Sequence, residues 1–182
     1  MNIPNKLTLS RIIMIPLFMF VLLQRENMAA TADIIALIIF SLAALTDALD
    51  GYLARKHELV TKFGKIADPL ADKLLIIAAL ISFVALGEIT VWPTILIIGR
   101  EMAVTGLRVV AASEGIIISA SYWGKAKTIT QIAAILSLII HPNIIAIGDF
   151  WPQLLLWLAV IITLYSGYLY FKSADIVLLS EE

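Results

Sequence analysis

Four aspartates at fixed spacings are the residues of this chain best suited to chemistry. Asp47 and Asp50 stand three positions apart and Asp68 and Asp72 stand four apart, and both pairs lie within strongly apolar sequence. On a helix such pairs project to one face, so two neighbouring helices can aim all four carboxylates at one point. Carboxylate oxygens without histidine or cysteine suit hard cations such as Mg²⁺, Mn²⁺ or Ca²⁺. The spacing therefore predicts a site for two metal ions.

The acids also have an alternative interpretation as ordinary interfacial carboxylates. Ionisable residues within a membrane span tend to mark function, but these lie near the ends of apolar runs, where that argument is weaker. They could simply pair with Arg55, Lys65 and Lys73. The small residues Gly51 and Ala54 favour a ligand, because they leave the helix surface bare and the glycine lowers helix stability. Small residues at this spacing also suit close packing of membrane helices.

Basic residues form a second constellation later in the chain. Its four members are Arg100, Arg108, Lys125 and Lys127. The two arginines are eight positions apart and share a helix face, and the two lysines begin the next apolar segment. Arginine offers a planar fork of donors and lysine a compact charge, so the cluster indicates a phosphate pocket. The alternative is pairing with Glu101 and Glu114, with the lysines reaching toward lipid headgroups.

The composition places the chain in a membrane. It has 182 residues, 61% of them apolar and 15% charged, and a mean hydropathy of +0.98. A helix needs about 20 residues to cross roughly 30 Å of hydrocarbon. The apolar runs therefore predict an all-α integral membrane protein of six transmembrane helices, with one membrane-embedded domain over residues 1–182. The chain has no cysteine, so disulfides, thiolate metal sites and cysteine nucleophiles are excluded.

The six predicted spans are apolar runs joined by short connections. They cover residues 7–23, 31–54, 66–86, 91–110, 129–140 with the preceding turn at 122–128, and 152–171. If both termini lie on one side, every lysine and arginine except Arg25 falls toward that side. The positive-inside rule makes that side cytoplasmic. The net charge of −1 carries little information about partners, and no nucleic-acid partner is expected.

The first apolar run has a competing interpretation as a cleaved signal peptide. Within this segment, Lys6 and Arg11 precede a stretch of 12 apolar residues, and residues 30–32 (Ala-Thr-Ala) have the form of a cleavage site. Against cleavage, Pro16 interrupts the run and the site lies far beyond its end. We therefore expect this segment to remain as the first span.

The aspartates stand in a longer pattern. The order D-x-x-D-G-x-x-A-R from Asp47 and, after eight residues, G-x-x-x-D-x-x-x-D from Gly64 resembles the signature of the CDP-alcohol phosphotransferase family. These integral membrane enzymes displace CMP from a CDP-linked donor with the hydroxyl of a second alcohol. One departure is Ala67, where a bulkier residue is expected before Asp68. The similarity extends to Asn5, Thr8, Arg11, Arg100, Glu101, Arg108, Gly124, Lys125, Lys127 and Thr128.

The resemblance assigns roles to particular residues. It implies two divalent cations, Mg²⁺ or Mn²⁺, held by Asp47, Asp50 and Asp68, with Asp72 as the base that also touches the second metal. For the CDP-diacylglycerol donor it implies Gly51, Ala54 and Gly64 around the cytidine, Arg55 facing the pyrophosphate, and Asn5 and Thr8 near the headgroup. The basic residues Arg100, Arg108, Lys125 and Lys127 would then bind glycerol 3-phosphate.

The implied reaction is transfer of a phosphatidyl group from CDP-diacylglycerol to glycerol 3-phosphate, with release of CMP. Sister activities in the family use inositol phosphate, phosphatidylglycerol or serine, and a basic cluster does not exclude inositol phosphate. From another class, a divalent-cation transporter would need polar residues at mid-membrane in several spans, whereas these acids cluster at one interface. The resemblance also implies a homodimer in the bilayer of a bacterial inner or plasma membrane, with its active site facing the cytoplasm.

Overall fold

Helices account for every regular element in the part of the chain that the structure describes. The computed structural model describes the backbone of residues 3–57, 62–115, 122–141, 143–145 and 148–178, and the side chains of 7–46, 70–115, 122–141, 143–145 and 148–173. The helices are α1 (Ile3–Leu23), α2 (Arg25–Met28), α3 (Ala30–His57), α4 (Lys62–Ala85), α5 (Val91–Ser113), α6 (Tyr122–Ile140) and α7 (Phe150–Leu178).

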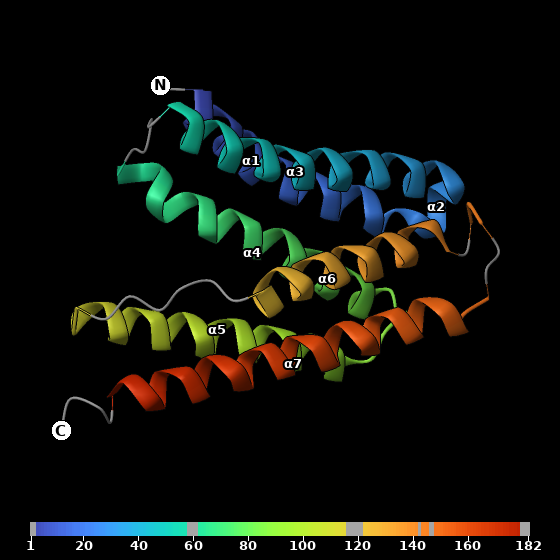
Figure 1. The fold of residues 1–182 in the computed structure, drawn as a ribbon. Helices are drawn as coiled ribbons and strands as arrows, with labels where there is room; N and C mark the ends of the chain where they lie inside the picture. The colour runs from blue at the N-terminus through green and yellow to red at the C-terminus, as the bar shows by residue number, and fades with distance from the viewer. Residues whose placement is uncertain (1–2, 58–61, 116–121, 142, 146–147, 179–182) are drawn as a thin grey trace.

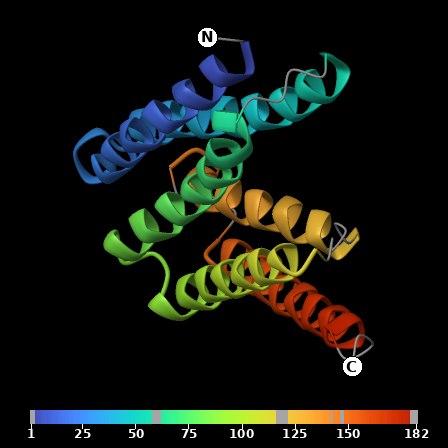
Figure 2. The same ribbon diagram turned by 90° about the vertical axis from the view of Figure 1, so that its left-hand side faces the viewer.

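The six long helices run along the molecule in alternating directions (Figure 1). Figure 2 shows α1 and α3 together on one side and α5, α6 and α7 on the other, with α4 between the two groups. At one end of the molecule α3 ends, α4 begins, α5 ends and α7 ends; we call this the site end, and the opposite end the far end. Because α1 also begins there, the arrangement agrees with the expectation that both termini share one side.

Local sequence explains where several helices begin and end. Pro93 and Pro152 lie in the first turns of α5 and α7, where a missing backbone N–H leaves no helical hydrogen bond unmade. At the end of α4, Gly87 adopts a φ of +72°, which residues with a Cβ rarely adopt. Its N–H donates to the Val84 carbonyl and the next N–H donates to the Phe83 carbonyl, both at 3.0 Å. These two hydrogen bonds cap the C-terminus of α4, and the chain then turns toward α5.

The distribution of polar side chains is inverted relative to a water-soluble bundle. Large apolar side chains point outward on several helices, including Phe20 at 64% exposure, Ile38 at 53% and Ile161 at 62%. Polar groups meanwhile lie inside, and the buried Gln131 donates to the Thr163 hydroxyl at 2.9 Å. An exterior of this kind favours contact with lipid over contact with water.

The six predicted spans correspond to the six long helices, but not all of these helices are both long and apolar enough, in their described residues, to cross a membrane. Among the described residues, one helical stretch, Phe150–Ser173, is long and apolar enough to cross a membrane. The stretches Leu7–Leu23 and Ala30–Thr46 are apolar but shorter. The described part of α5 carries Arg100, Glu101 and Arg108, which lowers its apolar character. The all-helical fold is confirmed, and the number of spans stays a prediction.

A buried ion-pair cluster connects several helices at the far end. Arg25 is only 6% exposed, and its Nε donates to Asp33, itself fully buried, at 2.5 Å. The same guanidinium pairs with Glu88 and donates to the Leu138 and Ile139 carbonyls at 3.2 and 3.1 Å. The sequence placed this residue, unlike the other basic residues, on the side opposite the site, and at the far end it joins α2, α3 and α6 to the turn after α4.

Candidate active site

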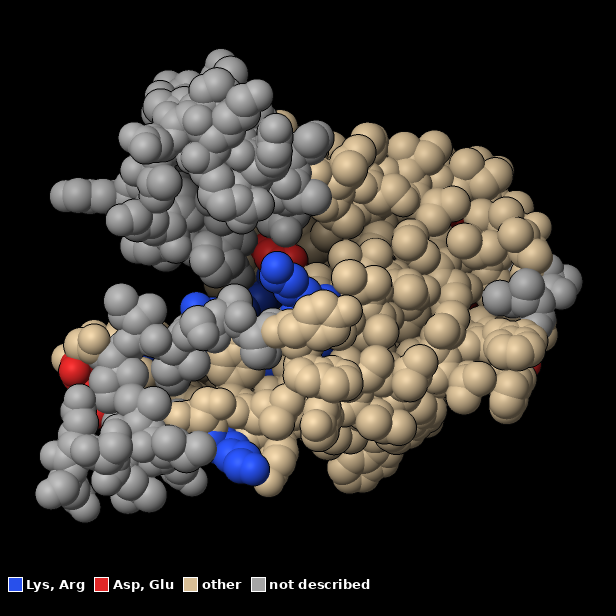
Figure 3. Space-filling view, viewed as in Figure 1, with Lys and Arg blue, Asp and Glu red and all other residues tan. Residues whose placement is uncertain are grey.

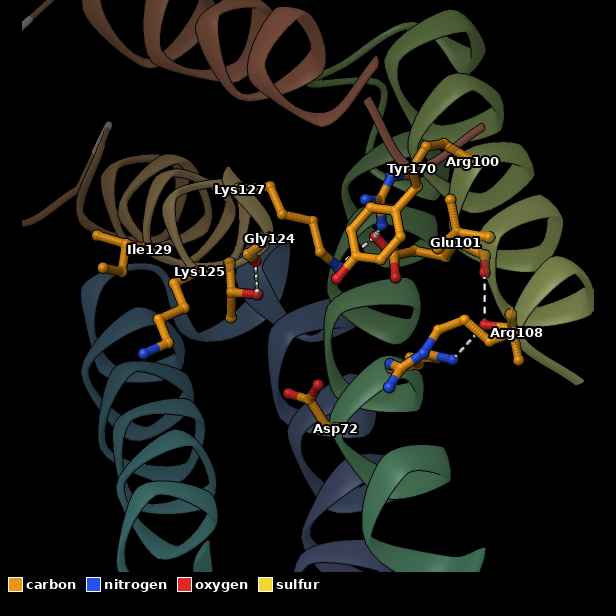
Figure 4. Close-up of a pocket in the computed structure, with 13 residues that line it drawn as sticks. Asp72, Arg100, Glu101, Arg108, Gly124, Lys125, Lys127, Ile129 and Tyr170 are labelled. Atoms are coloured by element: carbon orange, nitrogen blue, oxygen red, sulfur yellow. Dashed lines mark hydrogen bonds and ion pairs between the residues drawn. The ribbon is translucent and has the colours of Figure 1, made fainter. Parts of the chain in front are cut away.

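A cavity of about 510 Å³ lies among α4, α5, α6 and α7. Among the residues that line it are the predicted base and the four predicted phosphate ligands: Asp72 from α4, Arg100 and Arg108 from α5, and Lys125 and Lys127 from α6 (Figure 4). The structure thus brings the four basic residues together, and both arginines reach the cavity from α5. Their role as ligands of a phosphate remains a prediction.

The four basic residues differ in how much water they meet. Arg100 is buried, at 8% exposure, and the Lys127 side chain is 14% exposed, whereas Arg108 and Lys125 are exposed. In the space-filling view, lysine and arginine side chains gather in a hollow with an acidic group beside them, while most of the described residues visible on this face are uncharged (Figure 3). We call these four residues the basic wall of the cavity. Arg108 and Lys125 form its solvent-exposed rim, and Arg100 and Lys127 form its sheltered part, where charge interactions are stronger.

Asp72 occupies the wall of the cavity contributed by α4. Its side chain is half-buried, and it lies across the cavity from the basic residues of α5 and α6 (Figure 4). The neighbouring Lys73 donates from Nζ to the Thr105 hydroxyl at 2.5 Å, which ties α4 to α5 beside the acid. A carboxylate placed next to a basic phosphate pocket can accept a proton from a hydroxyl whose phosphate is held there.

Arg100 reaches the cavity through a set of contacts that fix its guanidinium. Nη1 donates to Glu101 Oε1 at 3.1 Å, and Nη2 donates to the Ser166 hydroxyl of α7 at 2.5 Å. The guanidinium carbon lies 5.6 Å from the centre of the Tyr170 ring. At Gly167 an added Cβ would lie 2.9 Å from Arg100 Cγ, so glycine leaves the room that this side chain occupies against α7.

Glu101 is a component of the site whose part in it the sequence did not reveal. It is buried at 6% exposure, and its Oε1 accepts hydrogen bonds from both Arg100 and Lys127. The sequence suggested pairing with Glu101 as an alternative to a phosphate pocket. The structure shows this pairing in the lining of the cavity, so the two interpretations are compatible. Glu114, the other suggested partner, lies exposed just beyond the end of α5. Lys73, Thr105 and Tyr170 also line the cavity and were not predicted as site residues.

Most of the predicted metal and donor residues have side chains outside the part that the structure describes. Asp47, Asp50, Gly51, Ala54 and Arg55 lie on α3, and Gly64 and Asp68 lie on α4. The backbone therefore confirms that each aspartate pair lies on one helix, and α3 and α4 are in contact. Within the described side chains no group of three or more acids, histidines or cysteines lies close enough to hold a metal. Metal ligation by these aspartates stays a prediction.

Residues near the N-terminus pack against α3. The side chain of Asn5 lies outside the described set, whereas Thr8 and Arg11 are fully buried. Nε of Arg11 donates to the Ala43 carbonyl at 3.2 Å, one helical turn before Asp47. Arg11 therefore fixes α1 beside the part of α3 that carries the first aspartate pair, while contact of Asn5 and Thr8 with a donor stays a prediction.

Comparison with known proteins identifies the kind of protein to which this site belongs. Residues 1–165 match the family model described as CDP-alcohol phosphatidyltransferase. A CDP-diacylglycerol--glycerol-3-phosphate 3-phosphatidyltransferase of Bacillus subtilis (strain 168) is 44% identical over 181 residues, covering 94% of each chain. A protein of the same name from Rickettsia bellii is 38% identical over 175 residues, again covering 94% of each chain.

A protein from a third bacterium gives a similar result. A probable phosphatidylglycerophosphate synthase of Mycobacterium tuberculosis is 43% identical over 134 residues, which is 74% of this chain and 64% of that protein. Residues 1–165, which the family model matches, include both aspartate pairs and the basic residues of the cavity. The chain belongs to the CDP-alcohol phosphatidyltransferase family.

Proposed function

We propose that this chain is an enzyme that transfers the phosphatidyl group of CDP-diacylglycerol to glycerol 3-phosphate, giving phosphatidylglycerophosphate and CMP. The observation that carries the proposal is the cavity in which Asp72 lies beside Arg100, Arg108, Lys125 and Lys127. The names of the similar proteins from Bacillus subtilis and Rickettsia bellii support the same donor and acceptor.

The basic wall suits an acceptor that carries its own phosphate. Arg100 and Lys127 are sheltered from water, and Arg108 and Lys125 add charge at the rim. A phosphomonoester can accept hydrogen bonds from the guanidinium fork and from the ammonium groups at once. Serine and free inositol carry no phosphate, so this wall would give them less binding energy than it gives glycerol 3-phosphate.

The donor is proposed to lie where α3 and α4 meet at the site end. Asp47, Asp50 and Asp68 would hold two divalent cations, Mg²⁺ or Mn²⁺, and Gly51, Ala54, Arg55, Gly64, Asn5 and Thr8 would surround the CDP group. The fit rests on the donor set: three carboxylates at helical spacing on two contacting helices offer the oxygen ligands that hard cations prefer. Bound there, the cations would neutralise charge on the pyrophosphate.

The proposed chemistry is a single displacement at phosphorus. The basic wall holds the acceptor phosphate and directs its free hydroxyl toward Asp72. Asp72 takes the hydroxyl proton as the oxygen forms a bond to the phosphorus that bears diacylglycerol, and the bond from that phosphorus to the CMP oxygen breaks. CMP leaves with the electron pair. Most of the rate enhancement would come from positioning and from charge stabilisation.

The proposal includes the cellular setting. The chain would form one membrane-embedded domain over residues 1–182 with six spans, as a homodimer in a bacterial inner or plasma membrane, and the site end would face the cytoplasm. Outward-facing apolar side chains on α1, α3 and α7 support contact with lipid. A site at the interface would let the lipid donor enter sideways while the polar acceptor arrives from water.

CMP release by the purified protein tests the proposal. The assay would contain CDP-diacylglycerol and Mg²⁺ in lipid-containing detergent and would compare glycerol 3-phosphate with inositol phosphate, serine, inositol and phosphatidylglycerol. We expect turnover with glycerol 3-phosphate alone. Turnover with another acceptor would keep the reaction type and overturn the acceptor. No turnover with any acceptor, in protein shown to be folded, would overturn the enzymatic proposal and bring back transport of a divalent cation.

A further inference from the structure

A buried acid lies in the middle of the basic wall. Glu101 is 6% exposed and lies among cationic side chains that line the same cavity. For binding an anion, this charge is unfavourable, because a carboxylate repels a phosphate at short range and the repulsion is screened little away from water. If Glu101 helps an anion to bind, its interactions with neighbouring side chains must outweigh this repulsion.

Glu101 touches the two sheltered cations of the wall directly. One oxygen, Oε1, accepts from Arg100 Nη1 at 3.1 Å and also from the Lys127 ammonium group. Arg100 precedes it on α5, while Lys127 comes from α6, so the carboxylate holds together groups from two helices. A flexible lysine held by a charged partner loses less freedom when a ligand arrives, which improves binding through preorganisation.

The backbone of the same residue anchors a third cation. The Glu101 carbonyl accepts from the Thr105 hydroxyl at 2.6 Å, and that hydroxyl accepts from Lys73 Nζ at 2.5 Å. Arg100 in turn donates to Ser166 on α7. Through these contacts, α4, α5, α6 and α7 are joined around one residue at the wall of the cavity (Figure 4). Glu101 lies at the centre of that set.

We propose that Glu101 is a positioning residue for acceptor binding, which holds Arg100 and Lys127 in the arrangement that the acceptor phosphate requires. The proposal rests on the proposed function, because it concerns the affinity of that same pocket for glycerol 3-phosphate. It assigns Glu101 no contact with the reacting atoms. Its effect is exerted through the two cations, and it outweighs the direct repulsion between carboxylate and phosphate.

The replacement Glu101→Gln distinguishes repulsion of the phosphate from positioning of the cations, because the two effects change the KM for glycerol 3-phosphate in opposite directions. Glutamine has nearly the same shape and no charge, so removal of repulsion alone would lower the KM for glycerol 3-phosphate. Loss of positioning would raise it, because each cation loses its anionic partner and keeps at most a weaker hydrogen bond to the amide oxygen. We expect the KM for glycerol 3-phosphate to rise about tenfold. The KM for CDP-diacylglycerol should change less than twofold.

Two matched variants accompany this measurement. Glu114→Gln makes the same chemical change on an exposed residue just beyond the end of the same helix and should leave both KM values as in the parent protein. Glu101→Asp keeps the charge on a shorter side chain and should recover part of the affinity. If the glutamine variant does not fold in detergent, the aspartate variant still tests the proposal, since its KM for the acceptor should lie above that of the parent.

A double-variant cycle tests whether Glu101 acts through Lys127. The Lys127→Met change should raise the acceptor KM by itself, and adding Glu101→Gln should then raise it by less than it does in the parent protein. Full additivity, or an acceptor KM that falls or stays constant in Glu101→Gln, would overturn the proposal while leaving the enzyme assignment intact. An inactive parent protein would instead overturn the proposed function, so the two failures are distinguishable.

Discussion

Asp72 is the member of the predicted acid set whose side chain the structure describes, and its place in the cavity wall makes its role testable. We predict that Asp72→Asn lowers kcat at least about 100-fold, because the acceptor hydroxyl would lose the group that takes its proton. The KM for glycerol 3-phosphate should change much less, since the basic wall is kept. Steady-state rates of CMP release at varied acceptor concentration would measure both quantities.

The matched control for this variant is Asp149→Asn at the far end. Asp149 is an exposed acid that precedes the first residue of α7, pairs with His141 at 2.6 Å and does not line the cavity. Its replacement should leave kcat within about twofold of the parent. Equal loss of activity in the two variants would point to a general effect on stability and would contradict a specific role for Asp72.

Lys127 offers a test of the basic wall, because its side chain is largely sheltered from water. Replacement by methionine removes the charge and keeps most of the side-chain bulk. We predict that Lys127→Met raises the KM for glycerol 3-phosphate about tenfold, from loss of one charge-assisted hydrogen bond to the phosphate. Lys172→Met, an exposed lysine near the end of α7, serves as the control and should bind the acceptor as the parent does. A fall in donor affinity alone would contradict the assignment.

At the scale of residues, the sequence predicted which cations gather but not what organises them. Arg100 and Arg108 were placed on one face by their spacing, and helical periodicity alone was enough for that. The shared oxygen of Glu101 was not predictable, because it depends on how α4 and α7, which contact both helices, place α5 and α6 relative to each other. The roles of Asp47, Asp50 and Asp68 stay predictions, since their side chains lie outside the described part.

Among the elements, α5 and α7 approach each other where a glycine faces an arginine. We predict that Gly167→Ala displaces Arg100, because the new Cβ would lie 2.9 Å from its Cγ. The expected result is a rise in the KM for glycerol 3-phosphate, with kcat affected less. Kinetics at varied acceptor, together with thermal unfolding in detergent, would separate this effect from loss of fold.

Gly106→Ala is a control for that change on the facing helix. An added Cβ at Gly106 meets no atom within 4 Å, so the substitution should fit without displacement. Alanine is favoured over glycine inside a helix by up to about 1 kcal/mol, so this variant should be as stable as the parent or more so. If both variants bind the acceptor normally, the close approach at Gly167 does not govern the position of Arg100.

The far-end cluster fastens several helices, and its contribution is to stability. We predict that Arg25→Met lowers the free energy of unfolding by about 3–5 kcal/mol, because Asp33 would stay buried without its charge partner. Denaturant unfolding in detergent would measure the loss. The double variant Arg25→Met with Asp33→Asn should recover part of it, since no buried charge is then left unpaired. No recovery would contradict this explanation.

The helices themselves were largely predictable from the sequence. Long apolar runs bounded by polar and glycine-containing breaks gave six segments that agree with α1, α3, α4, α5, α6 and α7. The short helix α2 was missed, since four residues in a polar connection carry no periodic signal. Burial of Arg25 was also not predictable, because its partner Glu88 is 63 positions away. Such contacts follow from tertiary packing.

For the molecule as a whole, the absence of cysteine allows a direct test of orientation. The chain contains none, so one introduced cysteine is the sole labelling site. We predict that Ser113→Cys, exposed near the site end, is protected from a membrane-impermeant maleimide in intact cells and labelled after the membrane is opened. Asp149→Cys, 95% exposed at the far end, should react in intact cells. The reverse pattern would contradict a site that faces the cytoplasm.

The close contact at Gly167 also bears on how this sequence can change through descent. Since a methyl group at position 167 and a long side chain at position 100 compete for the same volume, neither site can drift freely while the other stays fixed. A lineage that acquires alanine at 167 is expected to carry a shorter or differently directed residue at 100. Related sequences would then show correlated replacements at positions 100 and 167, which lie on two helices and far apart in the chain.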